Sequence, residues 1–280
     1  MNYFNSQYRY MKIGRCMVDS EERLFLSDGQ NVRLLDGIND INKFIEQYGD
    51  TFSSTQYDGK FQYLPAVSPS KIFLPAVNFR SHSEESETRF PPKPYFFTKF
   101  SNALVAHGGT VHKPKEIEKL DYEGEIGIVI GRRGKRIPLE QAEDYVFGFT
   151  IVDDVSARDY QFPEMHPYGY NWVQGKAFDE ALPVGPYIVT KDEIKFPLKI
   201  ETRINGELRQ SGTTDDMIFS IAQLISTLSQ TITLDPGDLI TTGTPSGVAA
   251  FTAGRYLADG DTVSIEVSGI GELKHNIKDE

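Results

Sequence analysis

Acidic residues at the ends of two apolar segments are the first features that could do chemistry. Glu123 and Glu125 open the segment that continues IGIVIG, and Asp153 and Asp154 follow the segment FGFTIV. Alternate residues of a strand face the same side, so Glu123 and Glu125 can point inward together. Two inward carboxylates are costly unless a positive charge lies between them. Glu123, Glu125 and a member of the Asp153–Asp154 pair therefore form a candidate metal site.

Three oxygen ligands from two strands suit a hard cation such as Mg²⁺ or Mn²⁺. The chain has one cysteine, Cys16, and no cluster among its five histidines, which disfavours zinc. The pattern E-x-E is common, however, and two solvent-facing charges on an edge strand would have the same spacing. Spacing alone leaves both interpretations open.

Three weaker signals accompany the carboxylates. His82 and Glu85 are three residues apart, which on a helical turn lets the carboxylate orient the imidazole, although a surface pair has the same spacing. Lys176 stands between glycine and apolar residues and could face an anionic substrate or lie in a surface turn. The segment TTGTPSG at residues 241–247 could cradle an anion or form a plain turn.

These residues require a scaffold made mostly of strands. Apolar runs after residue 69 predict strands at residues 71–74, 95–98, 125–130, 147–153, 187–190, 198–204, 239–241, 262–267 and 272–275. Helical patterns are few, chiefly residues 139–145 and 215–229. We predict a mixed, β-dominated α+β fold with a rolled or barrel-like catalytic domain over residues 68–280. Residues 1–67, with short strands and a helix at 40–48, predict a small, variable α+β domain.

Composition excludes several function classes. The formal charge is −11, from 40 acidic against 29 basic residues, and no basic cluster offsets it, so we expect no nucleic-acid partner. No apolar run approaches the roughly 20 residues that span a bilayer. One cysteine and an N-terminus without the apolar core of a signal peptide suggest a cytoplasmic protein without a membrane partner.

Four motifs in a fixed order resemble the fumarylacetoacetate hydrolase family over residues 70–280. They are DYEGEIGIVIG, FTIVDDVSARDYQ, GKAFDEALPVGP, and INGELRQSGTTDDMIFSIAQLI with DPGDLITTGTPSGV. The resemblance implies the β-roll of that family, a homodimer and a divalent ion, Mg²⁺ or Mn²⁺. Nine residues match functional positions of the family: Glu123, Glu125 and Asp154 as metal ligands, Lys176 as the active-site lysine, His82 and Glu85 as a water-activating dyad, and Arg158, Gln161 and Thr244 at positions that contact substrate or support the site.

The sequence departs from the family pattern at two positions. Phe79 replaces a tyrosine, and Phe100 follows Lys99 where proline is usual. Because Val77 and Asn78 precede Phe79, the extra aspartate ligand of fumarylacetoacetate hydrolase itself is absent, which indicates the smaller branch of acylpyruvate hydrolases, decarboxylases, isomerases and dehydratases. We expect the polar segment at residues 81–94 to act as a lid. Specificity for the acyl group would come from this segment and from residues such as Phe79, Phe90 and Trp172, which could equally belong to the core or to an interface.

The function implied by the resemblance is hydrolysis of 2,4-dioxo acids (acylpyruvates) to pyruvate and a carboxylic acid. Water deprotonated by His82 would attack C4, and the ion with Lys176 would stabilise the pyruvate enolate. The same site could instead decarboxylate oxaloacetate, isomerise a hydroxydienoate or dehydrate a 2-keto-3-deoxy sugar acid. A non-catalytic dicarboxylate-binding protein is the lowest-ranked alternative, since every charged residue of the site is present.

Overall fold

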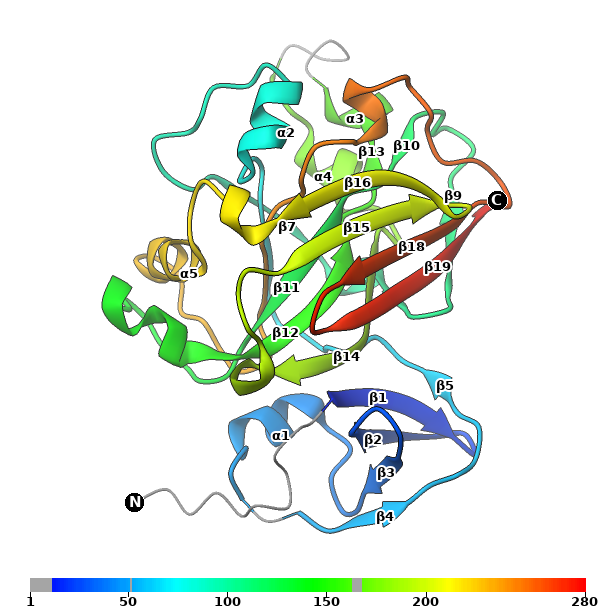
Figure 1. Cartoon of the computed structure of the whole chain (residues 1–280), viewed down its shortest axis with the longest axis vertical. Coiled ribbons are helices and arrows are strands. Elements are labelled where there is room, and N and C mark those ends of the chain that lie inside the picture. The colour runs from blue at the N-terminus through cyan, green and yellow to red at the C-terminus, as the bar shows by residue number, and fades with distance from the viewer. Residues whose placement is uncertain (1–11, 51, 163–167) are drawn as a thin grey trace.

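The computed structural model describes residues 12–50, 52–162 and 168–280, and most of their regular structure is in two large sheets. The larger sheet runs through β4 (Ser54–Gln56), β3 (Val32–Leu35), β2 (Glu21–Ser27), β1 (Lys12–Val18), β14 (Leu182–Thr190), β12 (Val146–Asp153), β11 (Gly124–Ile130), β17 (Leu239–Thr241), β6 (Ile72–Pro75) and β7 (Phe96–Lys99), with β5 (Gln62–Tyr63) beside β1 and β8 (Leu104–Ala106) beside β14. In Figure 1, strands β1–β5 lie at the bottom of the molecule, and β14, β12 and β11 lie above them.

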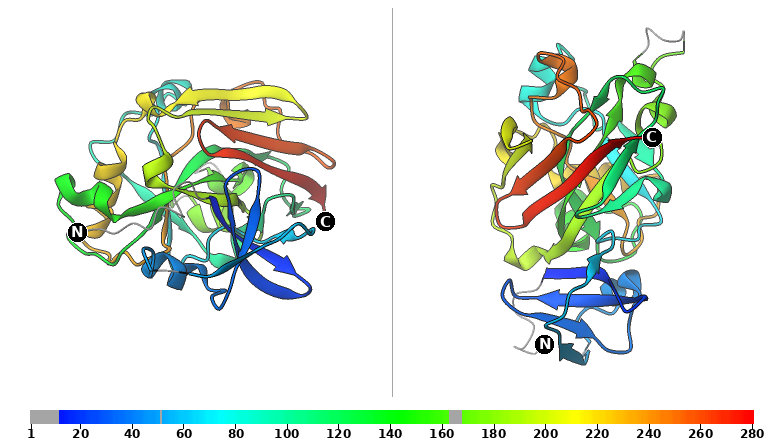
Figure 2. Two further views of the ribbon diagram at one scale, coloured as in Figure 1. Left: turned by 60° about the horizontal axis from the view of Figure 1, so that its bottom comes forward. Right: turned by 90° about the vertical axis from the view of Figure 1, so that its right-hand side faces the viewer.

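The second sheet has five strands and covers one side of the first (Figure 2). Its order is β16 (Glu207–Thr213), β15 (Lys199–Ile204), β18 (Thr262–Val267), β19 (Gly271–Asp279) and β9 (Thr110–Lys113). A short pair, β10 (Leu120–Asp121) with β13 (Ser156–Ala157), lies apart from both. The predicted β-dominated α+β class is confirmed.

Helices are short and few among the described residues, and none is long and apolar enough to cross a membrane. The α-helices are α1 (Ile41–Glu46), α2 (Arg80–Glu85), α3 (Arg158–Gln161), α4 (Trp172–Lys176) and α5 (Ile221–Ser229). The 3-10 turns are η2 (Ser101–Ala103), η3 (Leu139–Tyr145), η5 (Lys191–Glu193), η6 (Thr214–Asp216) and η7 (Ala249–Phe251). Helices α2 and α3 lie at the end of the molecule opposite β1–β4 (Figure 1).

Strands β11 and β12 form the centre of the larger sheet. They pair antiparallel from Gly124 opposite Asp153 to Ile130 opposite Val146, and every residue of both strands is buried. Burial on both faces explains why their sequences are continuous apolar runs instead of alternating ones. A long buried hairpin of this kind holds the residues at its open end in a fixed register.

Gly124 lets the two sheets approach each other beside that open end. A Cβ atom placed there would lie 2.2 Å from Oγ1 of Thr202 on β15. The amide of Gly124 also donates to Oε1 of Gln210 on β16, at 3.0 Å. Because neighbouring residues of an extended chain face opposite sides, the residues that flank Gly124 are directed away from the five-stranded sheet.

The N-terminal strands join the larger sheet through one short pairing, between β1 and β14 at Lys12–Val189 and Ile13–Ile188. Helix α1 lies between β3 and β4 and is three residues shorter than the predicted 40–48; the side chain of Asp40 caps its amino end. The boundary between residues 67 and 68 stays a prediction.

Other predicted elements also differ in extent, such as the strand predicted at 272–275, which spans Gly271–Asp279. The helix predicted at 215–229 is interrupted: η6 ends at Asp216, and α5 starts only after Ser220, which forms a capping box with Gln223. The strand predicted at 187–190 begins earlier, at Leu182. Its first half contains Pro183, which is normally a strand breaker, but here it lies where β14 pairs with the short parallel strand β8.

Candidate metal centre

The three predicted carboxylates meet at the open end of the β11–β12 hairpin. Glu123 immediately precedes β11, Glu125 is its second residue, and Asp154 directly follows β12. The amide of Asp154 donates to the carbonyl of Glu123 at 2.9 Å, which continues the hairpin by one pair. One ligand oxygen of each residue lies within 4.8 Å of the other two, and all three side chains are buried. The alternative of solvent-facing charges on an edge strand is therefore wrong.

Glu125 is the carboxylate that most needs a cation. Among the described residues it has no ion-pair partner, and its side chain accepts a hydrogen bond from the amide of Gly243 at 3.0 Å. Burial first, and then the charges of Asp154 and Glu123, raise the pKa of Glu125 well above its ordinary value. A divalent cation between the three oxygens would remove this conflict, so the donor set fits a hard ion such as Mg²⁺ or Mn²⁺.

Two buried lysines neutralise the other two carboxylates. Lys176 Nζ lies 2.6 Å from Oε2 of Glu123 and 2.8 Å from Oδ2 of Asp154. Lys99 Nζ lies 2.8 Å from Oδ1 of Asp154 and donates to the carbonyls of Val155 and Ala181. Burial lowers the pKa of Lys99 to about 8, against the opposing effect of Asp154. Lys176 was predicted, but Lys99 was missed as a site residue. Its only signal in the sequence is a lysine at the end of an apolar strand.

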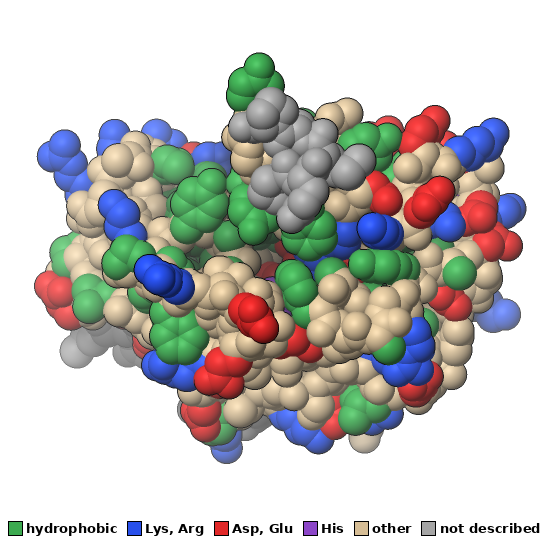
Figure 3. Space-filling model, turned by 90° about the horizontal axis from the view of Figure 1, so that it is seen from above, with side chains coloured by type: hydrophobic (Ala, Val, Ile, Leu, Met, Phe, Trp, Pro, Cys, Tyr) green, Lys and Arg blue, Asp and Glu red, His purple; other side chains and the backbone are tan. Residues whose placement is uncertain are grey.

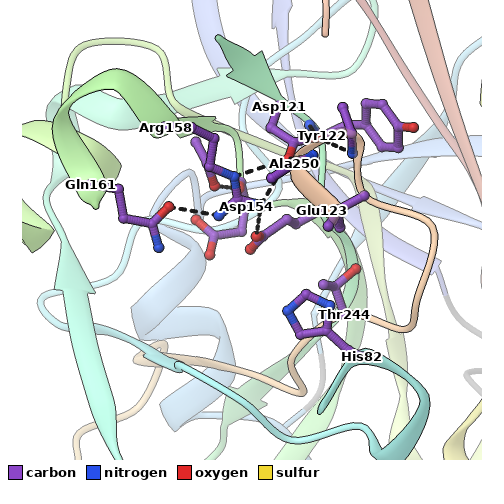
Figure 4. A network of polar contacts seen from close by, with 12 residues as sticks. His82, Asp121, Tyr122, Glu123, Asp154, Arg158, Gln161, Thr244 and Ala250 are labelled. Atoms are coloured by element: carbon purple, nitrogen blue, oxygen red, sulfur yellow. Dashed lines mark hydrogen bonds and ion pairs between the residues drawn. The ribbon is translucent and has the colours of Figure 1, made fainter. Parts of the chain in front are cut away.

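Arg158 and Gln161, at the two ends of α3, form the next part of the site (Figure 4). The guanidinium of Arg158 contacts Oδ2 of Asp121 at 2.9 Å, Oε1 of Glu123 at 2.5 Å and Oε1 of Gln161 at 2.6 Å. Burial raises the pKa of Glu123, but Lys176 and Arg158 together outweigh it and hold that pKa below its ordinary range. Arg158 is thus held in place as a charged side chain beside the carboxylate cluster.

Asp121 is a second residue that sequence reasoning missed. It is fully buried, and besides Arg158 it accepts the backbone amides of Ala249 and Ala250 at 2.8 and 3.0 Å. It therefore joins the strand that leads into the site to turn η7. Its only signal is its place at the start of the motif DYEGE.

The predicted dyad comes together without a hydrogen bond. His82 and Glu85 share a face of α2, with Nδ1 and Oε2 3.7 Å apart, which is beyond hydrogen-bond distance. Glu85 instead accepts the amide of Gly247 at 2.9 and 3.1 Å. Nδ1 of His82 is buried without a hydrogen-bond partner among the described residues.

Thr244 lies in the predicted TTGTPSG turn and fastens it to the hairpin. Its hydroxyl donates to the carbonyl of Gly124 at 2.9 Å and accepts from Gln210 at 2.8 Å. The turn therefore supports the strand between the carboxylates. A direct contact of Thr244 with substrate stays a prediction.

A pocket of about 390 Å³ opens beside these groups, and of the three candidate metal ligands Glu123 lines it. Figure 3 shows a hollow in this face of the molecule with hydrophobic side chains gathered around it. The pocket is lined by Ala76, Val77, His82, Ser86, Thr88, Arg89, Pro91, Tyr95, Phe97, Glu123, Arg158, Gln161, Phe162, Tyr170, Trp172, Lys176 and Phe251. Trp172 lines the pocket, and its role in specificity stays a prediction. Phe79 is fully buried outside this lining, and its role is in the core.

Comparison with known proteins identifies the family. The family described as Fumarylacetoacetate (FAA) hydrolase C-terminal matches residues 71–278, about three quarters of the chain. The chain belongs to this family. One relative of this fumarylacetoacetate hydrolase family member is oxaloacetate tautomerase YisK of Bacillus subtilis. The two are 46% identical over 222 residues, which cover 77% of this chain and 72% of YisK.

Two solved structures of the family extend the comparison. Fumarylacetoacetate hydrolase from Exiguobacterium antarcticum superposes with a TM-score of 0.85 at 30% identity, covering 96% of this chain and all of that one. Fumarylpyruvate hydrolase from Pseudomonas aeruginosa, in complex with Mn²⁺ and pyruvate, gives a TM-score of 0.69 at 33% identity over 76% of this chain and 91% of that chain. The predicted membership in the smaller branch is confirmed, and the chain is an enzyme of this family with a carboxylate site suited to a divalent metal.

Proposed function

We propose that this enzyme interconverts the keto and enol forms of oxaloacetate or a closely related 2-oxo acid, with a divalent metal ion as cofactor. The 46% identity to an oxaloacetate tautomerase supports this choice among the activities of the family. The structural observation that carries it is the pocket that Glu123, Lys176 and His82 line together. One carboxylate of the cluster, a fixed cation and an imidazole thus border the same cavity.

The ion would be held by Glu123, Glu125 and Asp154. It would supply a Lewis acid that lowers the energy of negative charge developing on the 2-oxo oxygen. Mg²⁺ and Mn²⁺ both accept this ligand set, and we propose Mg²⁺ as the ordinary cofactor.

The protein's own groups account for the proton transfers. Nε2 of His82, the ring nitrogen farther from Glu85, accepts a proton from C3 of the substrate as the C3–H bond breaks, and Glu85, whose Oε2 lies 3.7 Å from the buried Nδ1, favours the resulting imidazolium. The ammonium of Lys176, held between two carboxylates, is a preorganised positive charge beside the oxygen that gains electron density. The imidazolium of His82 then returns this proton to that oxygen, so the proton lost by carbon is the one gained by oxygen and the imidazole is regenerated.

The experiment follows the ultraviolet absorbance of enol-oxaloacetate as it relaxes to equilibrium in the presence of Mg²⁺. We expect the wild-type enzyme to accelerate the relaxation and His82→Asn to lower kcat by at least about 100-fold, the usual contribution of a general base. The matched control is His112→Asn, since His112 is exposed and pairs with Glu180 outside the pocket. Wild-type enzyme that does not accelerate the relaxation would refute the proposal.

Hydrolysis of acylpyruvates is the second candidate function. It is supported by the likeness to fumarylpyruvate hydrolase and by the imidazole of His82, which could deprotonate water as readily as carbon. Incubation with an acylpyruvate and Mg²⁺, with pyruvate measured by a coupled dehydrogenase, distinguishes the two. A kcat/KM for cleavage that exceeds the value for tautomerisation would place hydrolysis first.

We also propose that the enzyme acts as a homodimer. Light scattering on the purified chain tests this directly, because a dimer has twice the chain mass of 31.5 kDa. A mass equal to that of one chain, at concentrations used for the activity assay, would rule it out.

A further inference from the structure

The pocket has two chemically different parts. Its inner part is charged and buried: Glu123, Arg158 and Lys176 are at most 6% exposed. Its outer wall is largely apolar and aromatic, and Trp172 stacks there on Phe97 at 4.8 Å between ring centroids and on Tyr170 at 5.1 Å. A 2-oxo acid head belongs at the inner part, so the outer wall meets whatever the substrate carries beyond C3.

Arg89 is the cation of this outer wall. It lines the pocket and is exposed, and among the described residues it makes no hydrogen bond or ion pair. The two other cations of the lining are committed, Arg158 to Asp121 and Glu123, and Lys176 to Glu123 and Asp154. Within the described lining, Glu123 is the only acidic residue, and it lies in the inner part. The charge of Arg89 is therefore uncompensated inside the pocket.

The segment that carries Arg89 is anchored close to the proposed base. The amide of Thr88 donates to the carbonyl of Ser83 at 3.0 Å, and the hydroxyl of Ser83 donates to the carbonyl of Thr88. Ser83 directly follows His82 in α2. Arg89 thus follows a closed turn on the same short segment as His82, and both residues line the same pocket.

We propose that Arg89 binds the distal carboxylate of the substrate, so that the enzyme selects dicarboxylic 2-oxo acids over monocarboxylic ones. A planar guanidinium matches a carboxylate with two parallel hydrogen bonds, and an aromatic wall that partly excludes water strengthens them. This inference rests on the proposed function for the position of the 2-oxo head. It adds the residue that recognises the other end of the molecule.

The experiment measures binding of two stable ligands to the Mg²⁺-loaded enzyme by calorimetry. Pyruvate presents only the 2-oxo acid head, whereas 2-oxoglutarate adds a distal carboxylate and does not decarboxylate spontaneously. We expect Arg89→Gln to weaken 2-oxoglutarate by at least about tenfold, equivalent to about 1.4 kcal/mol, and to change the Kd of pyruvate by less than about twofold. The matched control is Lys93→Gln, an exposed cation a few residues along that does not line the pocket.

The outcomes separate this inference from the proposed function. Equal weakening of both ligands by Arg89→Gln, or the same weakening by Lys93→Gln, would show general attraction of anions and overturn the inference. So would an unchanged Kd for 2-oxoglutarate. Failure of wild-type enzyme to bind pyruvate would instead refute a 2-oxo acid site, and with it the proposed function.

Discussion

Replacing Lys99 with methionine should destabilise the metal-free protein strongly. Methionine keeps most of the apolar length of the side chain but removes the ammonium, which is fully buried and ion-paired with Asp154. It also leaves the carbonyls of Val155 and Ala181 without the donor that the lysine supplies. Loss of one partner of a buried ion pair costs about 3–5 kcal/mol, because the remaining charge stays buried.

Calorimetric unfolding in EDTA tests this expectation. For a protein somewhat longer than 250 residues, a loss of that size lowers Tm by roughly 6–20 °C. The control Lys93→Met removes an exposed lysine and should change stability by less than about 0.5 kcal/mol. A Tm for Lys99→Met within about 2 °C of wild type would contradict the reasoning, since Asp154 would then not depend on Lys99 for its charge balance.

Two further predictions concern packing and burial. Gly124→Ala should destabilise the protein and weaken metal binding, because the added Cβ would lie 2.2 Å from Thr202 Oγ1 and push the strand between the carboxylates away from the second sheet. In a thermal unfolding assay, the double variant with Thr202→Ala should recover part of the lost stability. If it recovers none, the clash with Thr202 is not the cause. Burial raises the pKa of the Cys16 thiol to about 11. The thiol of the folded state therefore keeps its proton when that of the unfolded state loses it near pH 9, so the free energy of unfolding falls as pH rises from about 9 to 11. Cys16→Ala should remove this part of the pH dependence. A stability–pH profile identical to that of wild type would show that Cys16 does not cause the fall.

The carboxylate cluster could be predicted because its geometry is local. Residues 123 and 125 are fixed by strand alternation, and Asp154 is brought beside them by an antiparallel hairpin whose two strands are obvious apolar runs. The family resemblance then chose Asp154 over Asp153. In the structure Asp153 accepts the amide of Glu123 and contacts His275, and its role is to hold the backbone.

The missed residues depend on contacts between distant parts of the chain. Lys99 reaches Asp154 only because β7 joins β6, and β6 pairs with β17 more than 160 residues later. Arg89 follows α2 in a polar segment whose path sequence alone does not determine. The start of β14 was also predicted wrongly, because Pro183 and Pro186 indicate a turn, whereas in the structure the strand continues through both and pairs with its neighbours. In each case tertiary packing overrides local preference.

The most direct test of the central claim is the stoichiometry of Mn²⁺ binding, measured by electron paramagnetic resonance on metal-free enzyme titrated with the ion. We predict that each chain binds one Mn²⁺ tightly, that excess Mg²⁺ displaces it, and that Glu125→Gln no longer binds it. The control Glu116→Gln replaces an exposed carboxylate and should bind as wild type does. Equal binding of Mn²⁺ by wild type and Glu125→Gln would contradict a metal centre on Glu123, Glu125 and Asp154.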